Sequence, residues 1–147
     1  MKIDLVVAGY IIHENKVLLI HHKKLDLWLP AGGHIDKNET FDQALHREIK
    51  EEIGIDVEIL NKGDMPLDKN VKYNLATPFY VNLHSVGNHD HCCLYYVCKA
   101  VNPEQLKINN ELKNFKWFTK ADLNKKHILA DVKSQCLKAF EVANCSK

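Results

Sequence analysis

The chain has 147 residues, a length typical of one domain that can bury a proper core, so we expect a single domain over residues 1–147. Its 20 basic and 19 acidic residues leave a formal net charge of +1, which provides no global field for stable binding to nucleic acid or to a membrane. Five scattered cysteines without a CxxC pair, and no apolar run of membrane-spanning length, favour a cytoplasmic protein with reduced thiols.

The first two predicted elements are runs of β-branched and aliphatic residues. Residues 3–13 (IDLVVAGYIIH) and 16–22 (KVLLIHH) are expected to form strands. Glu14 and Asn15 lie between them and suit a hairpin turn. We therefore expect the two strands to pair antiparallel.

A helix is predicted from Thr40 to Ile53. Thr40 and Gln43 have the spacing of a capping box, in which each side chain bonds to the backbone of the other residue. Gly54 stands where a helix C-terminus commonly ends.

The apolar face of this helix contains carboxylates. In helical projection Glu48 and Glu52 fall inside the apolar stripe, and Glu51 falls on its rim. Burying a carboxylate costs several kcal/mol unless a positive group meets it. Arg47 is best placed for Glu51 at i+4, which leaves Glu48 and Glu52 without a local partner. A divalent cation such as Mg²⁺ would satisfy both; the alternative is a helix whose glutamates stay in water.

The remaining elements alternate between strands and one more helix. A polar stretch over residues 62–74 is expected to be a loop. Helical spacing of apolar residues over 132–143 predicts a final amphipathic helix. Further strands are expected over residues 55–61, 79–86, 91–101 and 115–119. This order predicts an α/β fold, with a mixed β-sheet between helices in an α/β/α sandwich.

The segment HDHCC, residues 89–93, is rich in side chains that bind zinc. Alternation along a strand would send His91 and Cys93 to one face and Cys92 to the other. Tetrahedral zinc normally needs four converging ligands. From the segment alone we therefore favour buried thiols and a partly exposed histidine over a zinc site.

Residues 33–55 (GHIDKNETFDQALHREIKEEIGI) resemble the signature of the Nudix hydrolase family. That signature fixes a glycine, a glutamate, an Arg-Glu pair, a Glu-Glu pair, a second glycine and two aliphatic residues at set spacings. Every fixed position is met, by Gly33, Glu39, Arg47, Glu48, Ile49, Glu51, Glu52, Gly54 and Ile55. Such a match at fixed spacing is a highly specific signal. The resemblance implies the Nudix fold, which is an α/β/α sandwich.

The resemblance also implies a metal site. Glu48, Glu51 and Glu52 are expected to hold Mg²⁺ or Mn²⁺, with Gly32 donating a backbone carbonyl. Arg47 is expected to orient the carboxylates through ion pairs, and Glu39 to support the same network.

Other site residues are expected outside the signature. Family members often take one more carboxylate, as metal ligand or general base, from the loop before a late strand, and Glu111 is the best candidate here. An ordinary loop glutamate is the alternative. Lys23 and Lys24, after the second strand, are candidates to bind substrate phosphates, although exposed lysines on a turn usually serve only to keep a surface hydrated.

The function implied by the resemblance is metal-dependent hydrolysis of a phosphoanhydride in a nucleoside diphosphate linked to another moiety. Nucleoside triphosphates, ADP-ribose, dinucleoside polyphosphates and nucleotide sugars all fit this description. Two alternatives share the fold: a nucleotide-sensing module without turnover, and an isomerase of prenyl diphosphates. A small nucleotide is the expected partner, and since many relatives dimerise, a homodimer is compatible with the resemblance.

Overall fold

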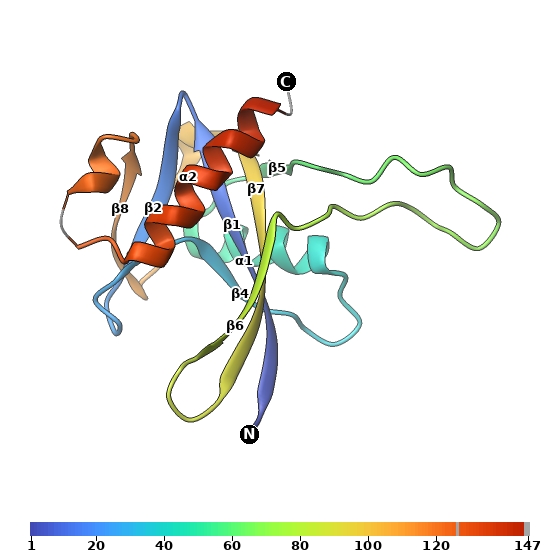
Figure 1. Ribbon diagram of the computed structural model, residues 1–147, viewed down its shortest axis with the longest axis horizontal. Helices are drawn as coiled ribbons and strands as arrows, with labels where there is room; N and C mark the ends of the chain where they lie inside the picture. Colours follow the sequence, from blue (N-terminus) through green and yellow to red (C-terminus); the bar gives the residue numbers. More distant parts are fainter. Residues whose placement is uncertain (126, 146–147) are drawn as a thin grey trace.

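The computed structural model describes residues 1–125 and 127–145, and in it one mixed β-sheet lies between two helices (Figure 1). The strands are β1 (Ile3–His13), β2 (Lys16–His22), β3 (Trp28–Leu29), β4 (Ala31–His34), β5 (Val57–Ile59), β6 (Tyr80–Ser85), β7 (Asp90–Ala100) and β8 (Leu112–Phe118). The α-helices are α1 (Phe41–Ile53) and α2 (Ala130–Cys145), and short 3-10 helices span Pro103–Gln105 and Asp122–Asn124. The expected α/β/α sandwich is confirmed.

Two long strands, β1 and β7, pair in parallel at the centre of the sheet. The strand order is β3-β2-β1-β7-β5, with β4 paired to β1, β6 to β7 and β8 to β2. On one edge of β1, the C-terminal part pairs with β2 and the N-terminal part pairs with β4. The predicted β1–β2 hairpin forms, and Glu14 and Asn15 both have positive φ, as a type I′ turn requires.

Strand β4 was not predicted from the sequence. Its residues, AGGH, include two glycines, which strands generally disfavour. It forms because its backbone pairs with Val6 to Gly9 of β1. The strand predicted over residues 55–61 is shorter in the structure, while β8 begins three residues before the predicted start at residue 115.

The two helices cover opposite faces of the sheet, and each face has its own core. Helix α1 buries Ala44, Leu45, Ile49 and Ile53 against one face. Helix α2 buries Val132, Cys136, Ala139, Phe140 and Ala143 against the other. The predicted helical spacing of both segments is confirmed, and the same packing fixes the direction in which α1 presents its glutamates.

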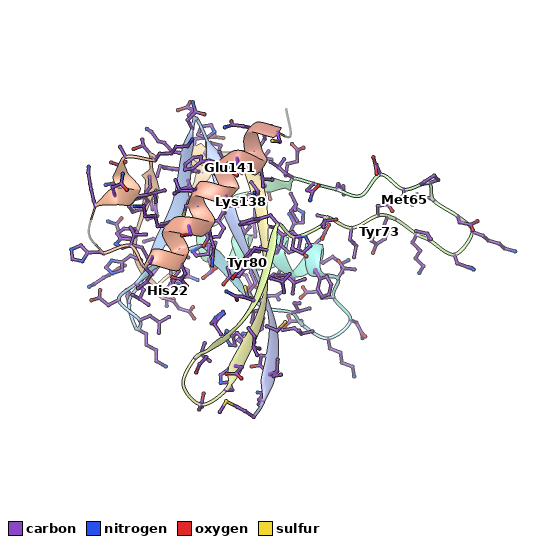
Figure 2. The ribbon with its side chains drawn as sticks, in the orientation of Figure 1. His22, Met65, Tyr73, Tyr80, Lys138 and Glu141 are labelled. Atoms are coloured by element: carbon purple, nitrogen blue, oxygen red, sulfur yellow. The ribbon has the colours of Figure 1, made fainter. Side chains whose placement is uncertain are left out.

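The segment between β5 and β6 leaves the body of the molecule as a long extended loop (Figures 1 and 2). Met65 and Tyr73 lie on it with exposed side chains (Figure 2). A single β-bridge joins Lys62 to Ala76 at its base. The expectation of a polar loop over residues 62–74 is confirmed.

Neither helix of the described chain has the length and apolar character needed to cross a membrane.

The capping box of α1 offers a test of how this helix is held. Thr40 Oγ1 accepts a hydrogen bond from the Gln43 N–H at 3.1 Å, and Gln43 Oε1 accepts one from the Thr40 N–H at 2.9 Å. Thr40→Ala should lower the free energy of unfolding by about 1 kcal/mol, because a backbone donor of the first turn loses its acceptor. Urea denaturation measures the change. The control Thr77→Ala, at an exposed loop position, should stay within about 0.5 kcal/mol of the wild type. Equal losses in both variants would contradict the prediction.

Candidate active site

The three signature glutamates of α1 differ in exposure. Glu52 is buried, with 7% of its surface exposed. The side chain of Glu48 is 17% exposed and that of Glu51 is 57% exposed. This order confirms the helical projection, with two carboxylates inside the packing face and one on its rim. The alternative in which all the glutamates stay in water is therefore wrong.

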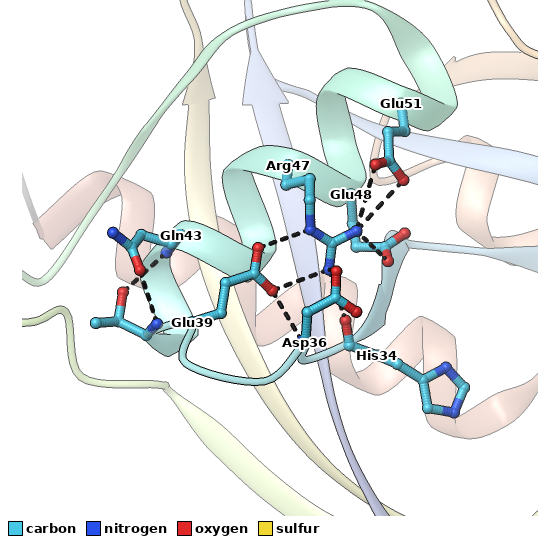
Figure 3. Close-up of polar contacts among 8 residues, drawn as sticks. His34, Asp36, Glu39, Gln43, Arg47, Glu48 and Glu51 are labelled. Carbon is cyan, nitrogen blue, oxygen red and sulfur yellow. Dashed lines mark hydrogen bonds and ion pairs between the residues drawn. The ribbon is translucent and has the colours of Figure 1, made fainter.

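Arg47 is the centre of the polar network beside these glutamates (Figure 3). Its Nε and Nη2 donate to the two carboxylate oxygens of Glu39 at 2.7 and 3.0 Å, which is a bidentate ion pair. Its Nη1 donates to Glu48 Oε1 at 2.9 Å and reaches Glu51 Oε2 at 3.3 Å. Its Nη2 also donates to the backbone oxygen of His34 at 2.9 Å.

This network corrects one expectation from the sequence. Glu48 does have a local partner, because the guanidinium of Arg47 bends toward the residue next to it as well as toward Glu51. The shortest of these contacts, however, goes to Glu39. The expected role of Glu39 as a support for Arg47 thus has a direct geometric basis.

Glu39 is fixed from both sides. Its Oε1 accepts the backbone N–H of Asp36 at 2.9 Å, in addition to the bonds from Arg47. The hydrogen bonds from Arg47 lower the pKa of Glu39, so its charge is secured. The carboxylate of Asp36 also lies 3.4 Å from Arg47 Nη2. Sequence reasoning missed Asp36, since the signature does not fix that position.

Glu52 carries the largest electrostatic cost in the site. Burial raises the pKa of Glu52 to about 8. One hydrogen bond opposes this shift: the Gly32 N–H donates to Glu52 Oε1 at 2.7 Å. The negative charges of Glu48 and Glu111 raise the pKa further. Burial likewise raises the pKa of Glu48, although Arg47 opposes that rise.

The two glycines of β4 are required by close packing. A Cβ on Gly32 would lie 2.0 Å from the Val7 backbone oxygen, and one on Gly33 would lie 2.4 Å from the carboxyl carbon of Glu48. A side chain at either position would therefore displace the strand or the carboxylate. The Gly32 N–H is the group that the structure directs at Glu52; a metal bond from the Gly32 carbonyl stays a prediction.

The residues predicted outside the signature are partly brought together. The charge of Glu111, on the turn before β8, raises the pKa of Glu52. Burial lowers the pKa of His22, and the charge of Glu111 opposes that fall. Lys23 reaches the same turn. Its backbone N–H donates to the backbone oxygen of Glu111 at 3.3 Å, and its Nζ donates to the backbone oxygen of Asn110 at 2.7 Å. Lys24 is exposed on the turn after β2. His22, the last residue of β2, thus also lies within the field of Glu111.

The arrangement suits a divalent cation. Glu48, Glu51, Glu52 and Glu111 supply carboxyl oxygens, while the positive charge of Arg47 is already shared with Glu39. A buried carboxylate surrounded by like charges is costly unless a cation neutralises it. Carboxylate oxygens are the ligands that hard cations such as Mg²⁺ prefer. The donor set thus fits the predicted metal on chemical grounds.

Comparison with known proteins identifies relatives along most of the chain. The family model described as NUDIX domain matches residues 3–140. A crystal structure of a hydrolase of the NUDIX family from Clostridium perfringens has a TM-score of 0.82 and 31% identity, with 97% of this chain and 99% of that chain covered.

Curated relatives match over shorter stretches. An 8-oxo-dGTP diphosphatase of Buchnera aphidicola is 38% identical over 61 residues, which is 39% of this chain and 47% of that protein. A CTP pyrophosphohydrolase of Escherichia coli is 38% identical over 63 residues, 40% of this chain and 47% of that protein. The chain thus spans about half the length of these two relatives.

The raised pKa of Glu52 predicts a pH dependence of stability in metal-free protein. Because the pKa rises from 4.5 to about 8 on folding, the folded protein binds this proton more tightly than the unfolded chain does. The stability from neutral Glu52 is full below pH 4.5 and is lost as the pH rises to about 8. Glu52→Gln keeps an acceptor for Gly32 and stays neutral. In EDTA, the free energy of unfolding of the variant should therefore rise relative to that of the wild type by up to about 1.4 kcal/mol per pH unit across this range.

Denaturation at a series of pH values measures that difference. The control Glu58→Gln, on an exposed position of β5, should follow the wild type. Parallel curves for wild type and Glu52→Gln would show that Glu52 is ionised without penalty.

Proposed function

The chain belongs to the NUDIX family, and from this premise we propose that it is a divalent-metal-dependent hydrolase of a phosphoanhydride in a nucleoside diphosphate linked to another moiety. The observation that carries the proposal is the buried Glu52 carboxylate beside Glu48, with one backbone hydrogen bond to offset its burial. Packing energy alone gives no reason to bury two carboxylates on one helix face. The names of the relatives, a diphosphatase and a pyrophosphohydrolase of nucleotides, support the same reaction class.

The proposed metal is Mg²⁺ or Mn²⁺, held by Glu48, Glu51 and Glu52 with the Gly32 carbonyl. Such an ion, when bound, neutralises phosphate charge and lowers the pKa of a coordinated water. The other residues of the site position these ligands. Arg47 holds Glu48 and Glu51 from one side, and the Gly32 N–H fixes the orientation of Glu52.

Glu111 is the proposed general base. It is exposed, so water can reach its carboxylate, and its charge acts on Glu52; both observations support this role. Ionised Glu111 can accept the proton of a water molecule as that water attacks phosphorus. Lys23, fixed to the same turn through Asn110, and Lys24 are proposed to attract the substrate phosphates.

Turnover of a nucleotide panel tests the proposal. The panel contains 8-oxo-dGTP, CTP, ADP-ribose, a dinucleoside polyphosphate and a nucleotide sugar, each with Mg²⁺ or Mn²⁺. At least one should release phosphate, directly or after phosphatase treatment. Glu52→Gln should lower that rate by at least about 100-fold, a loss of the size seen when one charge-stabilising group is removed from an active site.

The matched control is Glu58→Gln, which changes an exposed glutamate outside the site and should leave the rate unchanged. Two results would overturn the proposal. One is nucleotide binding without turnover in both wild type and Glu52→Gln, as a sensing module would give. The other is interconversion of prenyl diphosphates with no action on nucleotides.

The role of Glu111 has a separate test. If Glu111 accepts a proton in the rate-limiting step, Glu111→Gln should lower kcat by roughly 10²–10⁴-fold with little change in KM. The residual rate should rise with pH, because hydroxide replaces the missing base. The control Glu104→Gln changes another exposed glutamate and should keep the wild-type pH profile. A fall in kcat with an unchanged pH profile would assign Glu111 to a role other than proton transfer.

A further inference from the structure

A second group of metal-binding side chains lies outside the signature. Asp4 of β1, His34 of β4, His89 just before β7 and His91 of β7 each offer one ligand atom, and these atoms lie within 4.8 Å of one another. Three of the four residues are partly buried, and His34 is exposed. We propose that these four side chains bind one Zn²⁺ ion, at a site separate from the glutamates of α1.

The pairing of the strands brings these residues together. Asp4 lies directly beside His91 in the parallel pair of β1 and β7, and His34 lies opposite Val6 in the pair of β1 and β4. Side chains two residues apart on a strand share a face, so Asp4 and Val6 point to the same side of the sheet. Val6 belongs to the core under α2, which places the group on that face.

The group lies at the open end of that face. The N-terminal part of β1 and the β6–β7 hairpin extend past the end of α2 (Figure 1). In Figure 3 the ring of His34 points away from the Arg47 network. The glutamates of α1 lie on the opposite face, where Gly33, the residue before His34, meets Glu48. The two sites are thus on opposite sides of one strand.

Three of the distances within the group match the edges of a zinc tetrahedron. Asp4 Oδ2 lies 3.2 Å from His34 Nε2 and 3.3 Å from His89 Nε2, and His89 Nε2 lies 3.2 Å from His91 Nε2. Ligands about 2.0 Å from a tetrahedral ion are about 3.3 Å apart. Three ligand pairs therefore already have the spacing that a common Zn²⁺ would impose.

A hydrogen bond to the outer nitrogen of His89 leaves its inner nitrogen available. The Nδ1 of His89 is 2.7 Å from Asn88 Oδ1, an acceptor, and the ring tautomer that donates this bond leaves a lone pair on Nε2 for a metal ion. His89 Nε2 lies 3.3 Å from Asp4 Oδ2 and 3.2 Å from His91 Nε2. A cation between these three atoms would bind all of them through their lone pairs. A hydrogen-bond acceptor on the outer nitrogen is the usual way in which a protein orients a metal-binding histidine.

Neighbouring side chains help to hold Asp4 and His91 in place. Lys2 Nζ lies 3.4 Å from Asp4 Oδ1, which leaves Oδ2 for the histidines. His84 of β6 packs its ring at 5.6 Å from that of His91, and its Nδ1 is 3.0 Å from Asn82 Oδ1. His91 is thus held between His84, His89 and His34.

The donor set selects the kind of ion. Three imidazoles and one carboxylate suit Zn²⁺ and other late transition metals, whereas Mg²⁺ prefers oxygen ligands alone. An ion here would join β1, β4 and β7 at the end of the sheet that extends past α2. Its role is to hold these strand ends together. The inference does not depend on the proposed hydrolysis, because it concerns other residues on the other face.

Zinc titration tests the inference. Protein stripped by a chelator is titrated with Zn²⁺ against a chromophoric chelator, with excess Mg²⁺ present so that the glutamates are occupied. Wild type should bind one Zn²⁺ per chain, and Co²⁺ in its place should give the visible absorption bands of tetrahedral coordination. His91→Gln and Asp4→Asn should each weaken Zn²⁺ binding by at least about tenfold and remove the bands.

Two variants serve as controls. His13→Gln changes a histidine at the far end of β1, and Glu52→Gln changes the buried glutamate of α1; both should bind Zn²⁺ as the wild type does. The inference is overturned if the wild type binds no stoichiometric Zn²⁺, if His91→Gln and Asp4→Asn keep wild-type affinity, or if only Glu52→Gln loses the ion. The wild-type Co²⁺ spectrum decides the matter even where a variant fails to fold.

Discussion

The burial of the Glu52 carboxylate is the constraint on which the site depends. The helix that carries it must pack Leu45 and Ile49 against the sheet, and Glu52 lies on the same face. Removing a carboxylate from water costs several kcal/mol, and a single N–H from Gly32 offsets only part of this. Glu48 adds charge of the same sign. The fold thus holds a negative site whose natural complement is a cation.

Arg47 explains why the signature has fixed spacing. The guanidinium reaches Glu39 before the helix, Glu48 within it, and the backbone oxygen of His34 at the end of β4. These groups meet only if the turn between β4 and α1 keeps its length and Arg47 stays about two helical turns after the cap. A pattern that looks linear in the sequence is therefore a closed hydrogen-bond network in space. An insertion in the turn would separate Glu39 from Arg47.

The sequence was sufficient where local chemistry decides the structure. The bounds of α1 follow from the Thr40 capping box and from Gly54, whose φ is 71°, and the long strands follow from runs of β-branched residues. Strand β4 was missed because its glycines have low strand propensity and its backbone is ordered by β1. The pairing of Arg47 with Glu48 was missed because spacing along a helix does not show how a long side chain bends.

The histidine group shows a different limit of sequence reasoning. Alternation within residues 89–93 correctly separates neighbouring side chains, but it gives no information about residues that other strands bring to the same place. Asp4 and His34 come from two other strands, and only the sheet register shows that they join His89 and His91.

The same alternation gives β4 a double role. Gly33 accommodates Glu48 on one face and His34 joins the histidine group on the other, while the His34 carbonyl receives Arg47. Any ion held by His34 would therefore restrain the strand whose backbone also aligns Arg47. Sites of different chemistry, one of oxygen ligands and one mainly of imidazoles, can then be linked through a single pair of adjacent residues without sharing a ligand.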